Sequence, residues 1–473
     1  MLFNSFVFVG FFAAVYSAYI LLQGRLRLQN RLLLVASYVF YGYWDWRFLS
    51  LLLVSTLLDY WVGHRLFATN DPRRRKHLLG VSLVGNLGLL GFFKYFNFFT
   101  DSFADLLRAF GMAPDLFTLN IVLPVGISFY TFQTISYSFD IYRRKLRPAG
   151  NFLDFALFVS FFPQLVAGPI ERAANLLPQV ERPRRITADQ VNAGIFLLLW
   201  GYFQKVVIAD NAALLANEIF NDYTSFSGLD LWIGTLAFAI QIYGDFSGYS
   251  DIARGLCKLM GFELMVNFKL PYFALNPSDF WSRWHVSLST WLRDYLYIPL
   301  GGNRLGRVRT YANLMMTMLL GGLWHGAAWT FVLWGGFHGL ILVLYRRFDR
   351  DPEHADPWGG RYAYSRVIAK MALMFVLTMI GWMIFRSETL GQLGYFLARG
   401  GPMPSASSLY LGHRLLFFAA PLVAMNLFQY VRIDLLAPTK LPLPVRVPVY
   451  AFMLVWIFIF GVRESIEFVY FQF

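Results

Sequence analysis

The chain has 473 residues, of which 57% are hydrophobic, 19% aromatic and only 15% charged, and its formal net charge is +13. This composition excludes an ordinary soluble enzyme and predicts an all-α polytopic membrane protein. A spanning helix needs about 20 apolar residues, so the apolar runs predict about ten or eleven crossings, with re-entrant and amphipathic helices between them. We expect a single integral-membrane domain over residues 1–473, with its core motif region at 240–340.

The basic residues gather in short segments between the apolar runs, as at Arg73 to Lys76, Arg143 to Arg147 and Arg346 to Arg350. This positive-inside pattern predicts cytoplasmic loops and argues against a nucleic-acid-binding function. The loop 217–230 has three carboxylates and no base, which predicts the outer face. The single cysteine, Cys257, excludes an internal disulfide and is expected to be a small buried residue.

The apolar runs predict the crossings in chain order. They lie at 3–22, which we expect to be a retained first span, and at 32–45, 48–67, 78–97, 118–141, 191–214, 231–249, 363–386, 411–431 and 447–463. Residues 152–170 differ, because basic loops flank them on both sides and Pro163, Gly168 and Pro169 interrupt them, so a re-entrant segment is expected. Residues 98–111 and 389–399 are predicted to be amphipathic interfacial helices.

Two histidines stand among tryptophans and glycines between Asn276 and Trp329. Asn276 and Pro277 predict a helix start, and 3.6-residue spacing then predicts one amphipathic helix to Tyr295 with His285 on its apolar face. Ionisable groups in membrane-embedded sequence are costly, so they are candidates for function. The same spacing also fits a core histidine that is hydrogen-bonded to the backbone.

His325 is flanked by Gly321, Gly322 and Gly326, in a run at 311–346 that is too short for two ideal spans and too long for one. Glycines in such a run indicate either close helix packing or an interrupted backbone that lines a cavity. We predict a broken element with His325 at mid-membrane depth. An imidazole there suits general-base catalysis, because its unperturbed pKa is about 6.5.

Other polar residues also lie within apolar runs. Lys205 is expected to snorkel or to be paired, and Asp245 and Tyr249 share a helix face, where they form either a bracing hydrogen-bond network or part of a site. His338 would face away from His325 if the helix continued, so it is expected to be structural.

The sequence resembles the membrane-bound O-acyltransferases, and within them the branch that O-acetylates polysaccharides such as alginate. The resemblance rests on five segments in the family's order: FYTFQTISYSFDIYRR (129–144), FFPQLVAGPI (161–170), DFSGYSDIARG (245–255), FWSRWHVSLSTWLRDYLYIPLGGNR (280–304) and LLGGLWHGAAWT (319–330). It implies that His325 is the catalytic histidine and that His285 is a second active-site histidine. It also implies a multi-pass protein of the bacterial inner membrane.

The chemistry of acyl transfer needs a base, donors for the oxyanion and exclusion of water. Beside the two histidines, the expected supporting residues are Asn303, Trp324, Trp284, Asp245 and Tyr249. The resemblance implies acetyl-CoA as the cytoplasmic donor, no bound cofactor and a periplasmic serine-esterase-like partner that completes transfer to a polysaccharide. Arg304, Arg307 and Arg309 are candidate donor-binding residues, although solvated topology charges are the stronger explanation of them.

The sequence contains few of the motifs that would indicate another function. G-x-S-x-G, Walker A and HExxH motifs do not occur, so a serine hydrolase, an ATP-driven protein and a metalloprotease are not indicated, and no metal site is expected. A transporter would also have broken helices, but it would need coupling carboxylates, for which only Asp245 and Asp251 qualify. Transfer of D-alanyl or another acyl group to teichoic acid or peptidoglycan remains the other enzymatic reading.

Overall fold

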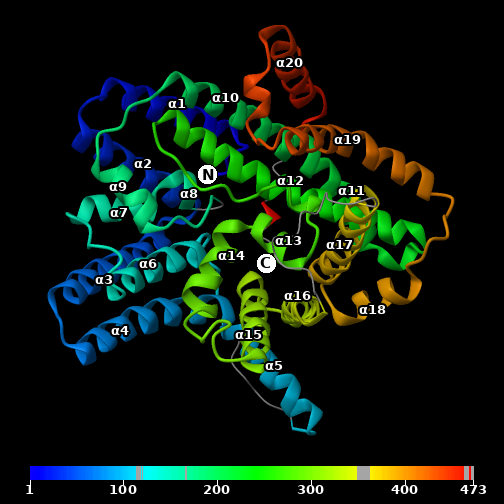
Figure 1. The fold of residues 1–473 in the computed structure, drawn as a ribbon, viewed down its shortest axis with the longest axis horizontal. Helices are drawn as coiled ribbons and strands as arrows, with labels where there is room; N and C mark the ends of the chain where they lie inside the picture. Colours follow the sequence, from blue (N-terminus) through cyan, green and yellow to red (C-terminus); the bar gives the residue numbers. More distant parts are fainter. Residues whose placement is uncertain (113–118, 120, 166–167, 349–362, 463–467, 470–473) are drawn as a thin grey trace. The chain divides into compact units, whose positions relative to one another are not determined.

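The computed structural model describes all residues except 113–118, 120, 166–167, 349–362, 463–467 and 470–473. Its described residues form helices and connecting loops without a strand, and the only pairing of β type is an isolated bridge between Gly228 and Gly400. The protein is therefore an all-α polytopic membrane protein. Its contacts cluster into two compact units: one is Met1–Val191 with Leu256–Met265, and the other is Asn192–Gly255 with Val266–Phe473 (Figure 1).

The first unit consists of nine helices, counted over its described residues. They are α1 (Phe6–Leu21), α2 (Leu26–Asp45), α3 (Leu49–Ala68), α4 (Pro72–Leu90), α5 (Phe96–Ala109), α6 (Ile127–Tyr142), α7 (Phe152–Ser160), α8 (Phe162–Leu165) and α9 (Ala173–Glu181). Helices α3, α4 and α6 pack against one another (Figure 1). Between them Asp59 is fully buried and accepts hydrogen bonds from Ser82, Asn86 and Ser138. These three donors to the carboxylate are all neutral side chains.

The second unit carries the predicted core motifs. Its helices are α10 (Ala188–Tyr202, which starts in the first unit), α11 (Asp210–Asn221), α12 (Leu229–Leu259), α13 (Pro277–Arg283), α14 (Val286–Leu292), α15 (Arg307–His325), α16 (Trp329–Phe348), α17 (Ala363–Arg386), α18 (Leu390–Arg399), α19 (Ser408–Arg432) and α20 (Leu443–Phe460). Two π-helical segments interrupt them, η3 (Phe203–Ala209) and η6 (Arg293–Tyr297). Such segments are rare and recur at functional sites.

Five helical segments in the described part of the chain are long and apolar enough to cross a membrane. They are Pro72–Ala109, Ala188–Asn221, Tyr364–Arg386, Ser408–Arg432 and Leu443–Phe460, and α1 is a shorter apolar helix. The count of ten or eleven crossings stays a prediction. Residues 98–111 fall mostly on α5, as expected, and α5 continues from α4 through a π-helical turn in one 38-residue segment. The expected interfacial location of this helix stays a prediction.

The run 152–170 is broken, as its prolines and glycine predicted. It contains α7 with nine residues and α8 with four, and residues 166–167 lie outside the described part. At 1.5 Å per residue, α7 is about 14 Å long, roughly half of the ~30 Å hydrocarbon core. Neither helix is long enough to span by itself, which fits a re-entrant segment, while the side on which it enters stays a prediction.

Candidate active site

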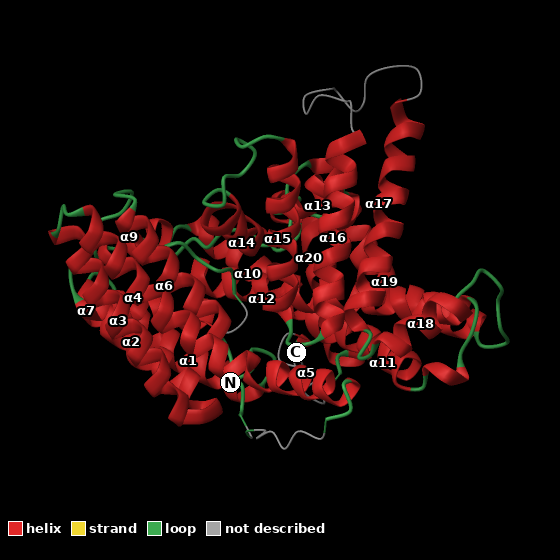
Figure 2. Cartoon of the chain, turned by 90° about the horizontal axis from the view of Figure 1, so that it is seen from below, coloured by secondary structure: helices red, strands yellow, loops and turns green. Residues whose placement is uncertain are grey.

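Helices α15 and α16 form a close hairpin that fixes His325 (Figure 2). A Cβ on Gly322 would lie 2.2 Å from the Phe331 carbonyl oxygen, and one on Gly335 would lie 2.3 Å from that of Met318. Glycine is therefore required at both positions for the backbones to approach this closely. The predicted break near His325 is confirmed: Gly321 and Gly322 lie inside α15, and the break comes at Gly326, directly after His325 ends the helix.

His285 lies at a second break, which corrects the single helix expected from Asn276 to Tyr295. The Asn276 side chain caps α13 as predicted, accepting from the Asp279 N–H at 2.8 Å, but α13 ends at Arg283 and α14 begins at Val286. His285 between them has a φ of 43°, in the left-handed region. The physical reason is a contact distant in sequence, described next.

The backbone N–H of Val286 is hydrogen-bonded to Asn267, outside the helix. The Val286 N–H donates to the Asn267 carbonyl at 2.9 Å instead of to a residue one turn back. The Asn267 side chain then accepts from the Ser287 hydroxyl, also at 2.9 Å. The helix is therefore interrupted where a neighbouring loop satisfies its backbone donors.

The two histidines come together in the second unit. Their ring centroids are 6.2 Å apart with an interplanar angle of 59°, and their exposed fractions are 0% for His285 and 3% for His325. The Trp324 ring contacts both, at 6.0 Å from His285 and 5.0 Å from His325. The structure thus places three of the predicted site residues in one buried cluster.

Aromatic side chains that the sequence analysis did not single out complete this cluster. Trp334 and Phe385 pack edge-on against His325, at 5.0 and 5.6 Å, and Phe246 packs edge-on against His285 at 4.6 Å. The only sequence signal was indirect, since Phe246 follows Asp245 within a family segment. A site enclosed by such rings excludes water, which strengthens electrostatic interactions inside it.

Two indole groups offer hydrogen-bond donors near this cluster. The Nε1 atoms of Trp334 and Trp284 are buried and have no acceptor among the described residues. Trp334 touches His325, whereas Trp284 packs on Phe268 and Trp382, at 4.9 and 4.7 Å. A buried donor without an acceptor is costly, so Trp334 Nε1 is a candidate donor to a substrate oxygen.

His338 lies on α16, which begins after the break that follows His325. The helix is interrupted after His325, so the orientation expected of His338 in a continuous helix does not apply. His338 is 1% exposed and contacts Trp334 at 4.7 Å, so the same indole separates the two imidazoles. Phe280 and Trp281 pack on its other sides. His338 therefore packs against Trp334, one of the rings that contact His325.

Lys205 is paired, one of the two arrangements expected of it. Its ammonium lies 2.7 Å from Asp210 and 2.9 Å from Asp245, and all three side chains are at most 3% exposed. Asp245 also accepts from the Val469 N–H at 2.7 Å, while the Tyr249 ring lies 5.8 Å from the ammonium. This ion cluster joins η3 to α12, which supports the bracing interpretation of Asp245 and Tyr249.

The remaining predicted residues are not brought to the histidines. Asn303 is exposed in the turn before α15, and Arg304, Arg307 and Arg309 are exposed in the same turn and at the start of that helix. The histidine rings are buried, so Asn303 is not among the side chains that contact them. For the arginines, donor binding stays a prediction.

Comparison with known proteins assigns the family. The model of the membrane-bound O-acyltransferase family matches residues 143–385, which include both histidines. The chain is 45% identical to a probable alginate O-acetylase of Pseudomonas putida over 395 residues, covering 82% of this chain and 78% of that protein. The chain belongs to the membrane-bound O-acyltransferase family.

Two further relatives are also O-acetylating enzymes by name. A probable alginate O-acetylase of Pseudomonas aeruginosa is 45% identical over 393 residues, which are 82% of this chain and 73% of that protein. A peptidoglycan O-acetyltransferase of Helicobacter pylori is 36% identical over 420 residues, which are 82% of this chain and 78% of that protein. This chain is accordingly an O-acyltransferase, and the residues that perform the transfer are proposed below.

Proposed function

We propose that the protein is an O-acetyltransferase of the bacterial inner membrane that takes acetyl from acetyl-CoA on the cytoplasmic side and passes it outward for O-acetylation of a polysaccharide. The observation that carries the proposal is the buried contact of His285 and His325 among aromatic rings. The names of the relatives favour alginate as the polymer and keep peptidoglycan as an alternative.

In the proposed reaction His325 acts as the general base. It takes the proton of the attacking hydroxyl, and the oxygen electrons then form the new bond to the acetyl carbonyl carbon. The Trp334 N–H is placed to donate to the oxyanion that develops, and the thiolate of the donor leaves. The second histidine, His285, is proposed to orient the substrate by a hydrogen bond.

The hydroxyl that reacts first belongs either to the polysaccharide or to a periplasmic partner. A serine-esterase-like acetyltransferase would accept the acetyl group and complete its transfer to the polymer. The exposed Arg304, Arg307 and Arg309 are proposed to bind the anionic nucleotide of the donor. The long apolar helices are proposed to hold the protein in the bilayer.

The test is acetyl transfer by the purified full-length protein supplied with acetyl-CoA carrying a labelled acetyl group. We expect consumption of the donor and label on an alginate or peptidoglycan acceptor when the partner transferase is added, with the His325→Ala protein as the control. If the protein does not consume acetyl-CoA but transfers a labelled D-alanyl group from a carrier protein, D-alanyl transfer replaces the proposed acetyl transfer. Accumulation of unchanged acetyl-CoA inside proteoliposomes would instead indicate a transporter.

A further inference from the structure

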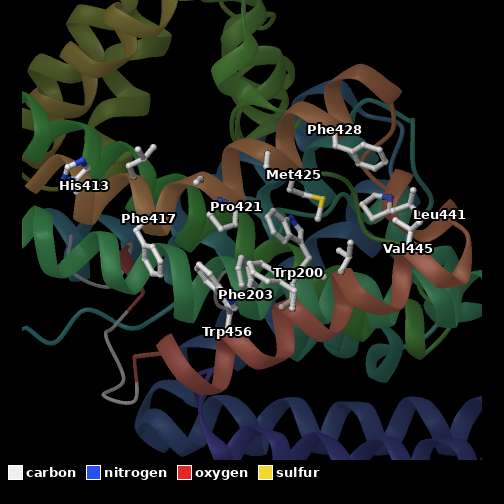
Figure 3. A pocket seen from close by; sticks show the side chains of 17 residues that line it. Trp200, Phe203, His413, Phe417, Pro421, Met425, Phe428, Leu441, Val445 and Trp456 are labelled. Atoms are coloured by element: carbon white, nitrogen blue, oxygen red, sulfur yellow. The ribbon is translucent and has the colours of Figure 1, made fainter.

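A long apolar groove runs along α19 and α20 in the second unit, away from the histidine site (Figure 3). Its volume is about 880 Å³, within the range of roughly 300–1,000 Å³ that is common for ligand sites. Of the 17 residues that line it, only His413 has an ionisable side chain. Trp200 and Phe203 also line it, and Phe417 on α19 stacks on Trp456 on α20 at 5.0 Å between ring centroids.

The sequence of α19 explains why this face is hollow. Pro421 lies inside the helix, where it removes one backbone hydrogen bond and bends the axis. Ala420 and Ala424 beside it have small side chains and also line the groove. Opposite them, α20 buries little of its surface, since only 6% of its apolar window is inside the protein. The groove is therefore a concave apolar surface on two predicted membrane spans.

The length of the groove matches a lipid chain. Its lining residues on α19 extend from His413 to Phe428, fifteen residues or about 22 Å at 1.5 Å per residue. One leaflet of a ~30 Å hydrocarbon core is about 15 Å deep. An acyl chain that enters beside Phe428 would therefore reach past Pro421 before leaving its leaflet.

Basic side chains stand at the Phe428 end. Arg446 follows the lining residue Val445 and donates from Nη1 to the Thr439 carbonyl at 2.9 Å and to Asn192 at 3.3 Å. Its Nε and Nη2 atoms have no acceptor among the residues that the structure describes. Lys440 lies between two lining residues and, although it is 2.8 Å from Asp434, its side chain is 76% exposed.

At the opposite end Arg414 follows His413 and is paired with Glu218 at 2.8 Å. Lys440 and Arg446 lie in the segment 437–448, which we expect to be cytoplasmic. At the Phe428 end an anionic headgroup thus has two basic side chains beside the groove.

We propose that this groove binds an anionic phospholipid, with the headgroup phosphate at Arg446 and Lys440 and one acyl chain between α19 and α20. A partner helix fits less well. A helix segment 22 Å long and 10 Å wide occupies roughly 1,700 Å³, about twice the groove volume. The apolar lining gives such a helix no polar group to recognise, whereas a flexible chain fills an irregular aromatic channel.

Native mass spectrometry of the purified, delipidated full-length protein tests this proposal. It is titrated with phosphatidylglycerol and with phosphatidylcholine of the same chain length. The wild type is expected to bind one phosphatidylglycerol well before non-specific adducts form. Ala424→Trp, which fills the groove, should weaken that binding at least about tenfold, or ~1.4 kcal/mol. Val423→Trp is the matched control, because Val423 neighbours it on α19 but faces outward and is not part of the lining.

A second set of variants, Arg446→Gln and Lys440→Gln, tests the proposed binding of the headgroup. Each should weaken phosphatidylglycerol binding about fivefold, or ~1 kcal/mol, and leave phosphatidylcholine binding unchanged. Equal binding by the Ala424→Trp and Val423→Trp proteins would overturn the site, as would a detergent-stable dimer that excludes lipid. If Ala424→Trp is not monodisperse, Ala420→Leu replaces it, with the same outcomes.

Discussion

The histidine site and the ion cluster lie in the same unit and are equally buried, yet they stabilise their polar groups in opposite ways. Lys205 has two carboxylates within 2.9 Å. The two histidines are surrounded instead by rings: Phe246 lies at 4.6 Å from His285, and Trp334 at 5.0 Å from His325. One arrangement neutralises charge, and the other leaves imidazoles in an apolar enclosure.

The difference indicates two kinds of function. A buried charge that is matched by opposite charges is a structural element, because removing one partner leaves the others uncompensated. An imidazole in aromatic surroundings can be replaced by another ring of similar size without a large loss of stability. Unlike such a ring, it can exchange a proton with a substrate. We therefore expect substitutions at the histidines to separate activity from stability, and substitutions in the ion cluster to change both together.

The largest effect is expected for His325→Ala. Loss of a general base lowers rates by about 10²–10⁴-fold, so acetyl transfer should fall by at least a hundredfold while the protein remains monodisperse. Activity and gel-filtration profiles of the same preparation check this. Retention of more than a tenth of wild-type activity would contradict the role of His325.

Lys205→Met is expected to act on stability first. It leaves Asp210 and Asp245 buried without their cation, and breaking a buried pair costs about 3–5 kcal/mol. The yield of folded protein and its thermal unfolding temperature should both fall. The double variant Lys205→Met with Asp245→Asn should recover part of the loss, and failure to recover any of it would argue against the ion pair as the cause.

His285 tests the comparison within the site itself. His285→Ala should lower activity about a hundredfold, whereas His285→Asn or His285→Gln should keep part of it, since an amide donates and accepts hydrogen bonds but does not titrate near pH 7. Activity is measured beside thermal stability. Equal losses in all three variants with unchanged stability would assign proton transfer, not orientation, to His285.

Glu171 is another buried carboxylate, outside the candidate spans, and it gives the smallest expected effect. Burial raises the pKa of Glu171 from 4.5 to about 7, although Asn175 and the Met265 N–H donate to it. A carboxyl whose folded pKa is raised binds protons more tightly when folded, so its contribution is present at pH 5 and is lost as the pH rises through 7. We expect about 1–2 kcal/mol less stability at pH 8 than at pH 5, and a flatter profile in Glu171→Gln, measured by thermal unfolding.

The sequence predicted what depends on neighbouring residues. The Asn276 cap, the break near His325 and a paired Lys205 all follow from local spacing and from the cost of unpaired charge. The interruption at His285 did not follow, because it depends on Asn267, eighteen residues earlier. The partners Asp210 and Asp245 were likewise unpredictable, since the contact between η3 and α12 joins segments whose pairing no periodicity encodes.

The supporting residues of the site show the same limit. Asn303 lies in a family segment and has suitable chemistry, yet the turn at 301–306 leaves it exposed. Trp334 and Phe385 were missed because an aromatic residue in an apolar run is most often lipid-facing or core. Only the return of α16 and α17 past the end of α15 brings these two rings to His325.

The left-handed backbone of His285 has a consequence for protein engineering. A residue with a side chain costs about 1–2 kcal/mol in this conformation, and glycine or asparagine adopts it more readily. A calculation or a screen that rewards heat resistance alone would therefore mark this position for replacement, although acyl transfer is expected to depend on it. Programmes that stabilise the enzyme for use outside its membrane should hold His285 fixed and search for improvement elsewhere.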